Sequence, residues 1–208
     1  MNKQPFIIPE LQEEELFHYL KKRTETLFGR TFDSSLSVIE LRSLDLQKDL
    51  PTIYNWVHQP YAKKFWQMNI GLAELEAFYL SVLKRADTHS IVASYNNQLV
   101  AQIDLYHAPF DEVGKCYPAT MNDYGLHFIM APVSERIPSF STIVFSAAVE
   151  FLFGFSCVHR VVGEPDSCNV KANELVQRAG FRFQQQIVLP DKVANLYFCD
   201  HSSFILPY

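Results

Sequence analysis

The sequence predicts a mixed α/β fold, with one β-sheet and helices on both of its faces. Two segments, 44–58 and 72–85, repeat apolar residues at the spacing of an amphipathic helix. Short stretches rich in apolar and β-branched residues alternate with the helices along the chain. Between two of these stretches lies Asn96-Asn97, a dipeptide that favours the positive φ angles of a tight hairpin turn. Together these patterns predict a single mixed sheet.

The predicted elements follow one another in the order β-α-α-β-β-β-α-β-α-β-β. Strands are expected at 36–41, 90–95, 98–106, 124–131, 159–164, 181–189 and 195–206, and helices at 44–58, 72–85, 138–155 and 167–179. Residues 1–35 are interpreted as an N-terminal extension that packs on the domain and contains a helix within 11–23. Residues 36–208 form one domain.

Capping residues define several of these boundaries. Asp45 is a suitable N-cap for 44–58, and Pro60 is expected to end that helix because proline lacks a backbone N–H. Pro138 can begin the next long helix, since its fixed φ suits a first turn. Gly180 is expected to end 167–179 in a left-handed conformation.

Composition limits the classes of function. The chain has 208 residues, of which 48% are hydrophobic, enough for one well-buried domain. The formal net charge of -5 gives no basic surface for a phosphate backbone, so nucleic acid is not an expected partner. The basic run Lys21-Lys22-Arg23 is interpreted as a solvated helix face.

The same composition points to a reducing compartment and to a protein without a metal. The four cysteines, Cys116, Cys157, Cys168 and Cys199, form neither a C-x-x-C pair nor a metal-ligand spacing. No secretory signal is visible in the first residues, and the longest apolar stretch, 142–158, is interrupted by polar residues. We therefore expect a cytoplasmic protein that binds no metal and no membrane.

A single histidine lies on the predicted strand at 124–131. His127 follows Gly125 and Leu126 in the segment Asn122-Asp123-Tyr124-Gly125-Leu126-His127. An imidazole that titrates near neutral pH is suited to general base catalysis. A buried histidine that only hydrogen-bonds to the backbone is the commoner arrangement, so the segment by itself does not decide between the two.

An acidic turn follows the strand at 159–164. The sequence Glu164-Pro165-Asp166 leads, through Asn169, into the helix that ends at Gly180. Ligands gather at the carboxyl ends of strands in open α/β sheets, which makes Asp166 a candidate for binding or catalysis. The alternative is that Asp166 or Ser167 only caps the helix, and the two roles are compatible.

Two tryptophans flank the proline turn at Pro60. Trp56 and Trp66 can close the edge of the core, or they can form the wall of a substrate slot.

With these segments in view, the chain resembles the acyltransferases of the GNAT superfamily. The run from Tyr124 to Leu189, with Asn169 and Ala179-Gly180-Phe181, is similar to their acyl-CoA-binding half. More narrowly, the chain resembles the siderophore-biosynthesis group: aerobactin-type hydroxylysine acetyltransferases, alcaligin-type proteins and mycobactin lysine acyltransferases. The segments that carry this likeness are Trp56 to Trp66, Asp104-Leu105-Tyr106, the Gly-Leu-His and Glu-Pro-Asp elements, and Leu189-Pro190-Asp191-Lys192-Val193-Ala194.

The resemblance implies a GNAT acyltransferase domain over 36–208, whose sheet opens in a V-shaped splay. It implies that His127 is the catalytic general base and that Asp166 is the catalytic carboxylate, which orients the imidazole or anchors the nucleophile. On the substrate side it favours the residues Trp66, Asp104, Tyr106 and Trp56.

For acetyl-CoA or another acyl-CoA as co-substrate, the resemblance implies a pantetheine cleft along the strand that carries His127. The expected contacts are Phe128, Ile129, Met130, Arg136, Ser139, Ser141 and Asn169. One feature departs from the family pattern: the turn 132–141, where these enzymes usually have glycines whose N–H groups hold the pyrophosphate, contains no glycine.

The function that these features imply is direct transfer of an acyl group, acetyl first, to the N-hydroxyl amine of a diamine or lysine-type substrate, giving a hydroxamate. An amine hydroxylase or a siderophore synthetase of the same pathway is the implied protein partner. Two alternatives stay open, an acetyltransferase for another amine such as an aminoglycoside and a non-catalytic acyl-CoA-binding domain. The sequence leaves the acyl length, the amine and the oligomeric state undecided.

Overall fold

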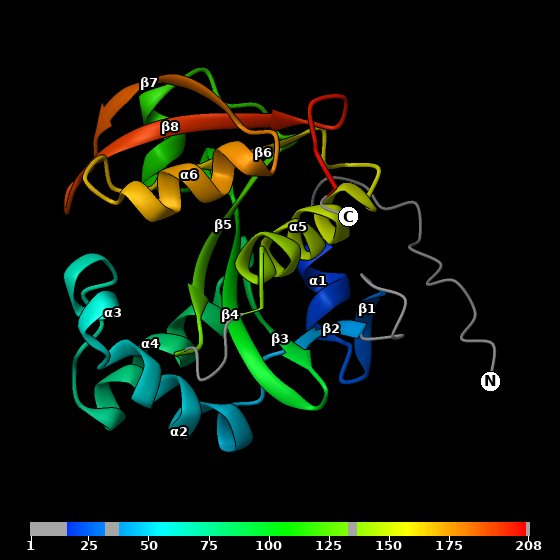
Figure 1. Cartoon of the computed structure of the whole chain (residues 1–208), viewed down its shortest axis with the longest axis vertical. Coiled ribbons are helices and arrows are strands. Elements are labelled where there is room, and N and C mark those ends of the chain that lie inside the picture. The colour runs from blue at the N-terminus through cyan, green and yellow to red at the C-terminus, as the bar shows by residue number, and fades with distance from the viewer. Residues whose placement is uncertain (1–15, 32–37, 133–136, 207–208) are drawn as a thin grey trace.

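A computed structural model describes residues 16–31, 38–132 and 137–206 (Figure 1). Within these residues, eight strands form one mixed sheet in the order β1-β2-β3-β4-β5-β6-β8-β7, in which β5 and β6 are the only parallel pair. The strands are β1 (Thr26–Thr31), β2 (Val38–Ser43), β3 (Thr88–Tyr95), β4 (Gln98–His107), β5 (Asp123–Met130), β6 (Arg160–Gly163), β7 (Arg182–Val188) and β8 (Val193–Asp200). The predicted mixed sheet is confirmed.

Helices cover both faces of the sheet, as predicted. They are α1 (Leu16–Lys21), α2 (Leu46–Val57), α3 (Pro60–Phe65), α4 (Leu72–Lys84), α5 (Phe140–Phe153) and α6 (Val170–Arg178), with two 3-10 turns, η1 (Ala108–Phe110) and η2 (Glu112–Cys116). The main core packs α1, α5 and α6 against one face, whereas a second core lies under α2 and α4 on the other. Figure 1 shows α5 across the sheet and α2, α3 and α4 grouped together.

Local sequence signals act as expected at several boundaries. The Asp45 side chain accepts hydrogen bonds from two amides at the start of α2. Asn96 and Asn97 adopt φ angles of 50° and 61°, so they form the mirror-image turn that joins β3 to β4. Gly180 follows α6 with a φ of 92°.

The structure differs from the predicted elements at several places, among them the last strand, expected at 195–206 but ending at Asp200. β1 was not predicted, yet it pairs with β2 and forms one edge of the sheet. Pro60 follows the end of α2 and also begins a further helix, α3. In the first turn of a helix the missing N–H of proline costs no hydrogen bond. The N-cap of α6 is Asn169 rather than Asp166 or Ser167, with its side chain accepting from Ala172 N at 3.2 Å.

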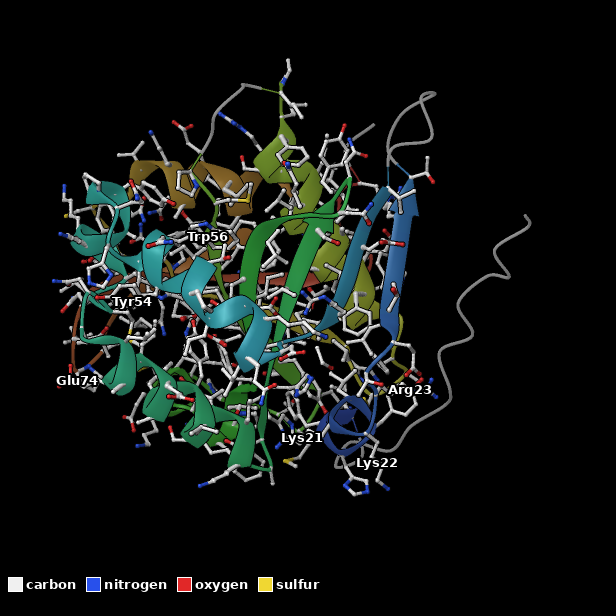
Figure 2. All side chains as sticks on the ribbon, turned by 90° about the horizontal axis from the view of Figure 1, so that it is seen from below. Lys21, Lys22, Arg23, Tyr54, Trp56 and Glu74 are labelled. Carbon is white, nitrogen blue, oxygen red and sulfur yellow. The ribbon has the colours of Figure 1, made fainter. Side chains whose placement is uncertain are left out.

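The basic run at the end of α1 lies far from the tryptophan of α2. Figure 2 shows Lys21, Lys22 and Arg23 on one side of the molecule and Trp56 on another. Arg23 pairs with Glu25 at 2.6 Å, and its guanidinium lies over the Tyr19 ring. These contacts are those of a solvated structural surface, and we assign no ligand to it.

The described part of the chain contains neither a membrane-spanning helix nor a cluster of metal-binding side chains. No helix there is long and apolar enough to cross a membrane. In the same residues no group of three or more His, Cys, Asp or Glu side chains is arranged to hold a metal ion.

The sheet opens between β5 and β6. Along its whole length β5 pairs with β4, from Ala101↔Met130 to His107↔Tyr124. With β6 it pairs only from Asp123↔Arg160 to Gly125↔Val162. Beyond Gly125 the two strands are no longer paired, and this is the V-shaped splay that the resemblance implied.

Candidate active site

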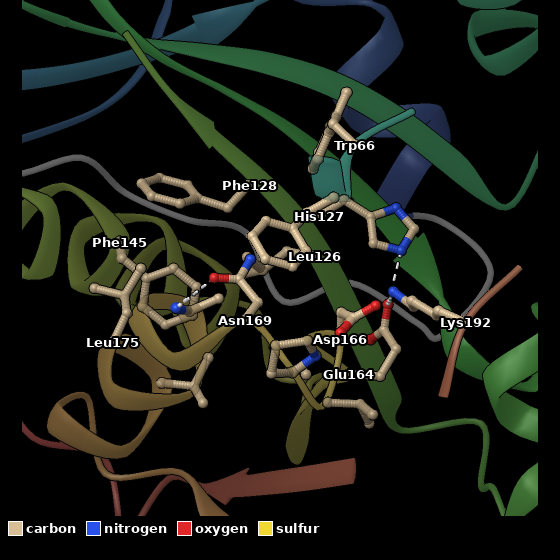
Figure 3. A pocket seen from close by; sticks show the side chains of 16 residues that line it. Trp66, Leu126, His127, Phe128, Phe145, Glu164, Asp166, Asn169, Leu175 and Lys192 are labelled. Atoms are coloured by element: carbon tan, nitrogen blue, oxygen red, sulfur yellow. Dashed lines mark hydrogen bonds and ion pairs between the residues drawn. The ribbon is translucent and has the colours of Figure 1, made fainter. Parts of the chain in front are cut away.

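The opening between β5 and β6 leads into a pocket with an empty volume of about 680 Å³, part of it open to solvent (Figure 3). One wall is apolar and comes from β5, α5 and α6: Leu126, Phe128, Phe145, Ala172, Leu175 and Val176. The other wall carries the polar groups and Trp66: His127, Glu164, Asp166 and Lys192. The pocket therefore joins an apolar slot to a charged rim.

Strand register explains how the polar groups come together. Asp104 lies directly opposite His127, and Tyr106 lies opposite Gly125. Residues two apart on a strand share a face, so all four project from the same face of the sheet. The ring centroids of Tyr106 and His127 are 4.8 Å apart.

Gly125 makes room for this arrangement. A Cβ atom at this position would lie 2.0 Å from Cζ of Tyr106, far inside van der Waals contact. The missing side chain therefore lets the Tyr106 ring lie across β5 and reach the end of β6. This is why the Gly-Leu-His element begins with glycine.

Glu164 is the carboxylate partner of the imidazole. Its Oε1 lies 2.8 Å from His127 Nε2, and its Oε2 accepts a hydrogen bond of 2.5 Å from the Tyr106 hydroxyl. Lys192 Nζ lies 3.8 Å from the same Oε1. The Glu164 side chain is only 4% exposed, whereas that of His127 is 39% exposed and faces the pocket. The imidazole is thus fixed from behind and accessible in front.

The charges of this cluster shift both acid-base groups. Burial alone would raise the pKa of Glu164, but the His127 charge, its hydrogen bond and Lys192 together hold that pKa well below its usual value. Burial alone would lower the pKa of His127, and the charge and hydrogen bond of Glu164 outweigh it, so that the pKa is raised. Each charged form of the pair is therefore favoured by the other.

A second buried carboxyl lies beneath the imidazole. Asp104 Oδ1 accepts hydrogen bonds from Ser90 Oγ and from Gln102 Nε2, the latter at 2.7 Å. Burial raises the pKa of Asp104. Asp104 does not line the pocket. It lies beside His127 as its cross-strand neighbour on the same face of the sheet.

The predicted catalytic pair falls in one pocket, although its geometry differs from the expectation. His127 and Asp166 both line the cavity. However, Asp166 Oδ1 accepts from the Cys168 amide at 2.7 Å, which is a local turn contact. The carboxylate that orients His127 is Glu164, two residues earlier in the same acidic turn. A catalytic role for Asp166 stays a prediction.

The four predicted substrate residues divide in two. Trp66 lines the pocket and meets His127 edge-on, with ring centroids 6.3 Å apart. Asp104 and Tyr106 lie behind the pocket wall, and Trp56 lies in the core under α2 at 5% exposure (Figure 2). Trp56 packs in the second core because it lies on the buried face of α2. Trp56 is therefore a core residue and does not line the pocket in which a substrate contact was expected.

The hydrogen bonds between β4 and β5 show which of the predicted cofactor-binding residues on β5 have backbone groups that face the opening. Because Ala131 N donates to Val100 O, odd-numbered residues of β5 bond to β4 and even-numbered ones turn their backbone groups towards the opening. Phe128 and Met130 thus face the splay, whereas Ile129 belongs to the β4–β5 ladder. The Met130 carbonyl accepts a hydrogen bond of 2.7 Å from the Tyr61 hydroxyl of α3.

The start of α5 provides the remaining predicted contacts. Ser139 adopts a φ of 58° immediately before the helix and makes no side-chain cap. It takes the left-handed conformation that glycine usually supplies, so the glycine-free turn still has that backbone shape. Ser139 and Ser141 are exposed there. Asn169 lines the pocket while it caps α6, and Arg136 lies outside the described residues.

Glu164 and Lys192 are functional candidates to which the sequence analysis gave no role. For Glu164 a signal was present: Glu164 lies two residues after Val162, so it continues the strand face that carries Val162. Lys192 comes from the connection between β7 and β8 and gave no comparable signal. Its place beside Glu164 depends on the antiparallel pairing of β6 with β8.

Comparison with known proteins identifies the family. Residues 45–189 match the model of the acetyltransferase (GNAT) domain. The chain belongs to this family. The predicted GNAT fold and acyltransferase class are thereby confirmed.

Relatives with assigned activities support the narrower resemblance. The chain is 28% identical over 165 residues to an N-hydroxyputrescine acetyltransferase of Acinetobacter baumannii, covering 79% of this chain and 78% of that protein. It is 26% identical over 179 residues to an aminoglycoside N(6')-acetyltransferase type 1 of Serratia marcescens, covering 84% and 88%. Among solved structures, an uncharacterised protein of Bacillus halodurans matches with a TM-score of 0.80 at 21% identity, covering 85% of this chain and 91% of that one.

Proposed function

We propose that this GNAT domain transfers an acyl group, preferably acetyl, from acyl-CoA to the nitrogen of an N-hydroxylated diamine or lysine-type amine. The product is a hydroxamate of the kind used to chelate ferric iron. The observation that carries the proposal is His127, held by Glu164 at the opening between β5 and β6 and accessible from the pocket. The N-hydroxyputrescine acetyltransferase among the relatives supports the choice of acceptor.

The acyl-CoA enters from the α5 side in this proposal. Outward-facing backbone groups of Phe128 and Met130 bind the pantetheine arm, and an N–H of this edge stabilises the oxyanion of the thioester carbonyl. Phosphates lie at the start of α5, where the Ser139 turn and the positive end of the helix dipole favour an anion. Asn169 and Arg136 are proposed as additional contacts.

His127 acts as the general base. With Nε2–H donating to Glu164, the neutral imidazole carries its lone pair on Nδ1. As the hydroxylamine nitrogen attacks the carbonyl carbon, Nδ1 takes the N–H proton, and Glu164 stabilises the imidazolium that forms. The tetrahedral intermediate then breaks its C–S bond, and the imidazolium returns the proton to the departing CoA thiolate. No covalent enzyme intermediate is involved.

The acceptor lies against the polar wall. Trp66 packs on the alkyl chain of the amine, and Asp166 anchors the distal ammonium of a diamine. Asp104 and Tyr106 do not contact the acceptor directly. Tyr106 holds Glu164 in place by donating a hydrogen bond to it. The proposed role of Asp166 is thus binding, in keeping with its place on the rim rather than against the imidazole.

Acetylation of an aminoglycoside amine is the second candidate. The Serratia marcescens relative supports it, since the match covers most of both chains. A polycationic sugar needs a carboxylate-rich rim, and the rim here mixes Glu164 and Asp166 with the cation Lys192. This balance favours a smaller acceptor.

A substrate panel tests the proposal. The purified protein is incubated with acetyl-CoA or succinyl-CoA and with N-hydroxyputrescine, N-hydroxycadaverine, N6-hydroxylysine, each parent amine or kanamycin. Release of CoA thiol measures turnover, and the ferric hydroxamate colour identifies the product. We expect turnover with at least one hydroxylamine. Turnover with kanamycin alone would favour the second candidate, and acyl-CoA binding without turnover on any acceptor would indicate a non-catalytic domain. Pull-down with a pathway hydroxylase or synthetase tests the implied partner.

A further inference from the structure

Lys192 brings a cation to the reacting end of the pocket. It belongs to the connection between β7 and β8, lines the pocket and has a side chain that is 18% exposed. Its Nζ approaches Glu164 Oε1, the same oxygen that His127 Nε2 contacts (Figure 3). One carboxylate oxygen therefore lies between the imidazole and an ammonium group.

The other side chains around Glu164 and His127 are neutral or acidic. Its second oxygen accepts from the Tyr106 hydroxyl, whose pKa is raised well above the usual value by burial, so this residue stays neutral. Asp104, on β4, faces His127 from behind and is satisfied by neutral donors. Asp166 faces the pocket from the acidic turn, with one oxygen on the Cys168 amide. The reacting position is thus flanked by Lys192 and by a carboxylate that is already neutralised.

Amines and hydroxylamines differ in charge at neutral pH. An alkylamine is protonated and has no lone pair for attack. The oxygen of a hydroxylamine withdraws electron density from nitrogen, so that nitrogen is much less basic and is mostly neutral. A fixed cation nearby disfavours a second cation and has little effect on a neutral group.

We propose that Lys192 is a specificity-determining residue, whose ammonium beside the Glu164–His127 pair disfavours a protonated amine at the reacting position and so selects N-hydroxylamines over their parent amines. This inference rests on the proposed function. It assigns to a residue of the β7–β8 connection the discrimination between two acceptors that differ by one oxygen atom.

The same cation affects the base. Lys192 lowers the pKa of His127 and opposes the effect of Glu164. Loss of the cation should raise that pKa, so that the imidazole becomes neutral only at higher pH. The acidic limb of the pH profile should therefore move to higher pH when Lys192 is neutralised.

The test compares the association constants of N-hydroxyputrescine and putrescine at neutral pH, and the pH profile of kcat/KM for N-hydroxyputrescine, in the wild type, Lys192→Met, Lys192→Arg and Lys84→Met. Lys84 is exposed at the end of α4, so its replacement changes net charge equally and leaves the pocket intact. For Lys192→Met we expect the ratio of hydroxylamine to amine to fall about tenfold, as a like-charge effect of one pKa unit predicts. Lys192→Arg and Lys84→Met should keep the wild-type ratio.

Two results would overturn the inference. One is an active Lys192→Met enzyme whose ratio and acidic limb both match the wild type. The other is a ratio that falls equally in Lys192→Arg, which would mean that shape rather than charge selects the acceptor. If Lys192→Met is poorly folded, Lys192→Gln supplies the same comparison. A wild-type protein that acylates no hydroxylamine would refute the proposed function itself, which distinguishes that failure from this one.

Discussion

The two sides of β5 differ in how they are paired, and the difference creates the site. On one side the β4 ladder is complete and fixes Asp104 opposite His127. On the other, pairing with β6 ends at Gly125 and leaves the rest of the edge to a pocket. The open edge therefore leaves backbone groups accessible from the pocket, while the closed side holds His127 in register. The same strand, β5, is thus fixed by pairing on its β4 side and accessible on its β6 side.

The two buried carboxyls show the same contrast. Asp104, on the closed side, is bonded to neutral donors, and burial raises its pKa. Glu164, at the open side, meets His127 and Lys192, and its pKa is lowered despite its burial. A carboxyl among charged partners stays ionised and can stabilise an imidazolium, which a carboxyl among neutral donors does less well.

The largest expected effect is at the base itself. His127→Ala removes the group that takes the proton, so kcat/KM for the hydroxylamine should fall by about 10²- to 10⁴-fold. Thermal unfolding should change little, because the side chain is partly exposed. His159→Ala, an exposed histidine before β6, is the matched control. Activity of His127→Ala within threefold of wild type would remove the base assignment.

The next effect separates the two carboxyls. In the wild type, we expect the acidic limb of kcat/KM to lie above the usual imidazole pKa, because Glu164 raises the pKa of His127. Glu164→Gln removes that charge and should move the limb to lower pH while the maximal rate falls by about 10-fold or more. Asp104→Asn is the comparison, and we expect a smaller shift in the same direction. An equal shift in both would show that the two carboxyls act alike.

The third effect tests the close approach at Gly125. Gly125→Ala forces the Tyr106 ring away from its place, and overpacking of this kind costs about 1–3 kcal/mol of unfolding free energy. Gly29→Ala on β1 is the control, since its nearest neighbour would lie at an ordinary 3.6 Å. Chemical denaturation measures both. An undisturbed Gly125→Ala protein would mean that the ring has another position available.

The smallest effect on turnover distinguishes the two tryptophans. Trp66→Ala, at the open side, should raise KM for the acceptor about 10-fold, which corresponds to ~1.4 kcal/mol of binding, with a small change in stability. Trp56→Ala, in the closed core, should lower the free energy of unfolding by about 3–5 kcal/mol and leave KM unchanged in the folded fraction. A raised KM for Trp56→Ala in the folded protein would contradict its position in the core.

The sequence by itself determined most of the elements, because their signals are local. Apolar spacing predicted α2 and α4, the Asn-Asn turn predicted the β3–β4 hairpin, and Gly180 marked the end of α6. The resemblance carried by the Gly-Leu-His and Glu-Pro-Asp elements led to the correct family and to the histidine in the pocket. Edge strand β1 escaped prediction because its large apolar residues, Leu27 and Phe28, are adjacent and do not alternate with polar ones.

Only the tertiary structure decided which carboxylate meets the imidazole. Glu164 and Asp166 are two residues apart, yet Glu164 contacts His127, whereas Asp166 bonds to the Cys168 amide. The tertiary structure also decided that Trp66 rather than Trp56 faces the pocket, and that Lys192 joins the cluster from the β7–β8 connection. These contacts join segments far apart in the chain, and their distances depend on strand pairing and packing that no local pattern specifies.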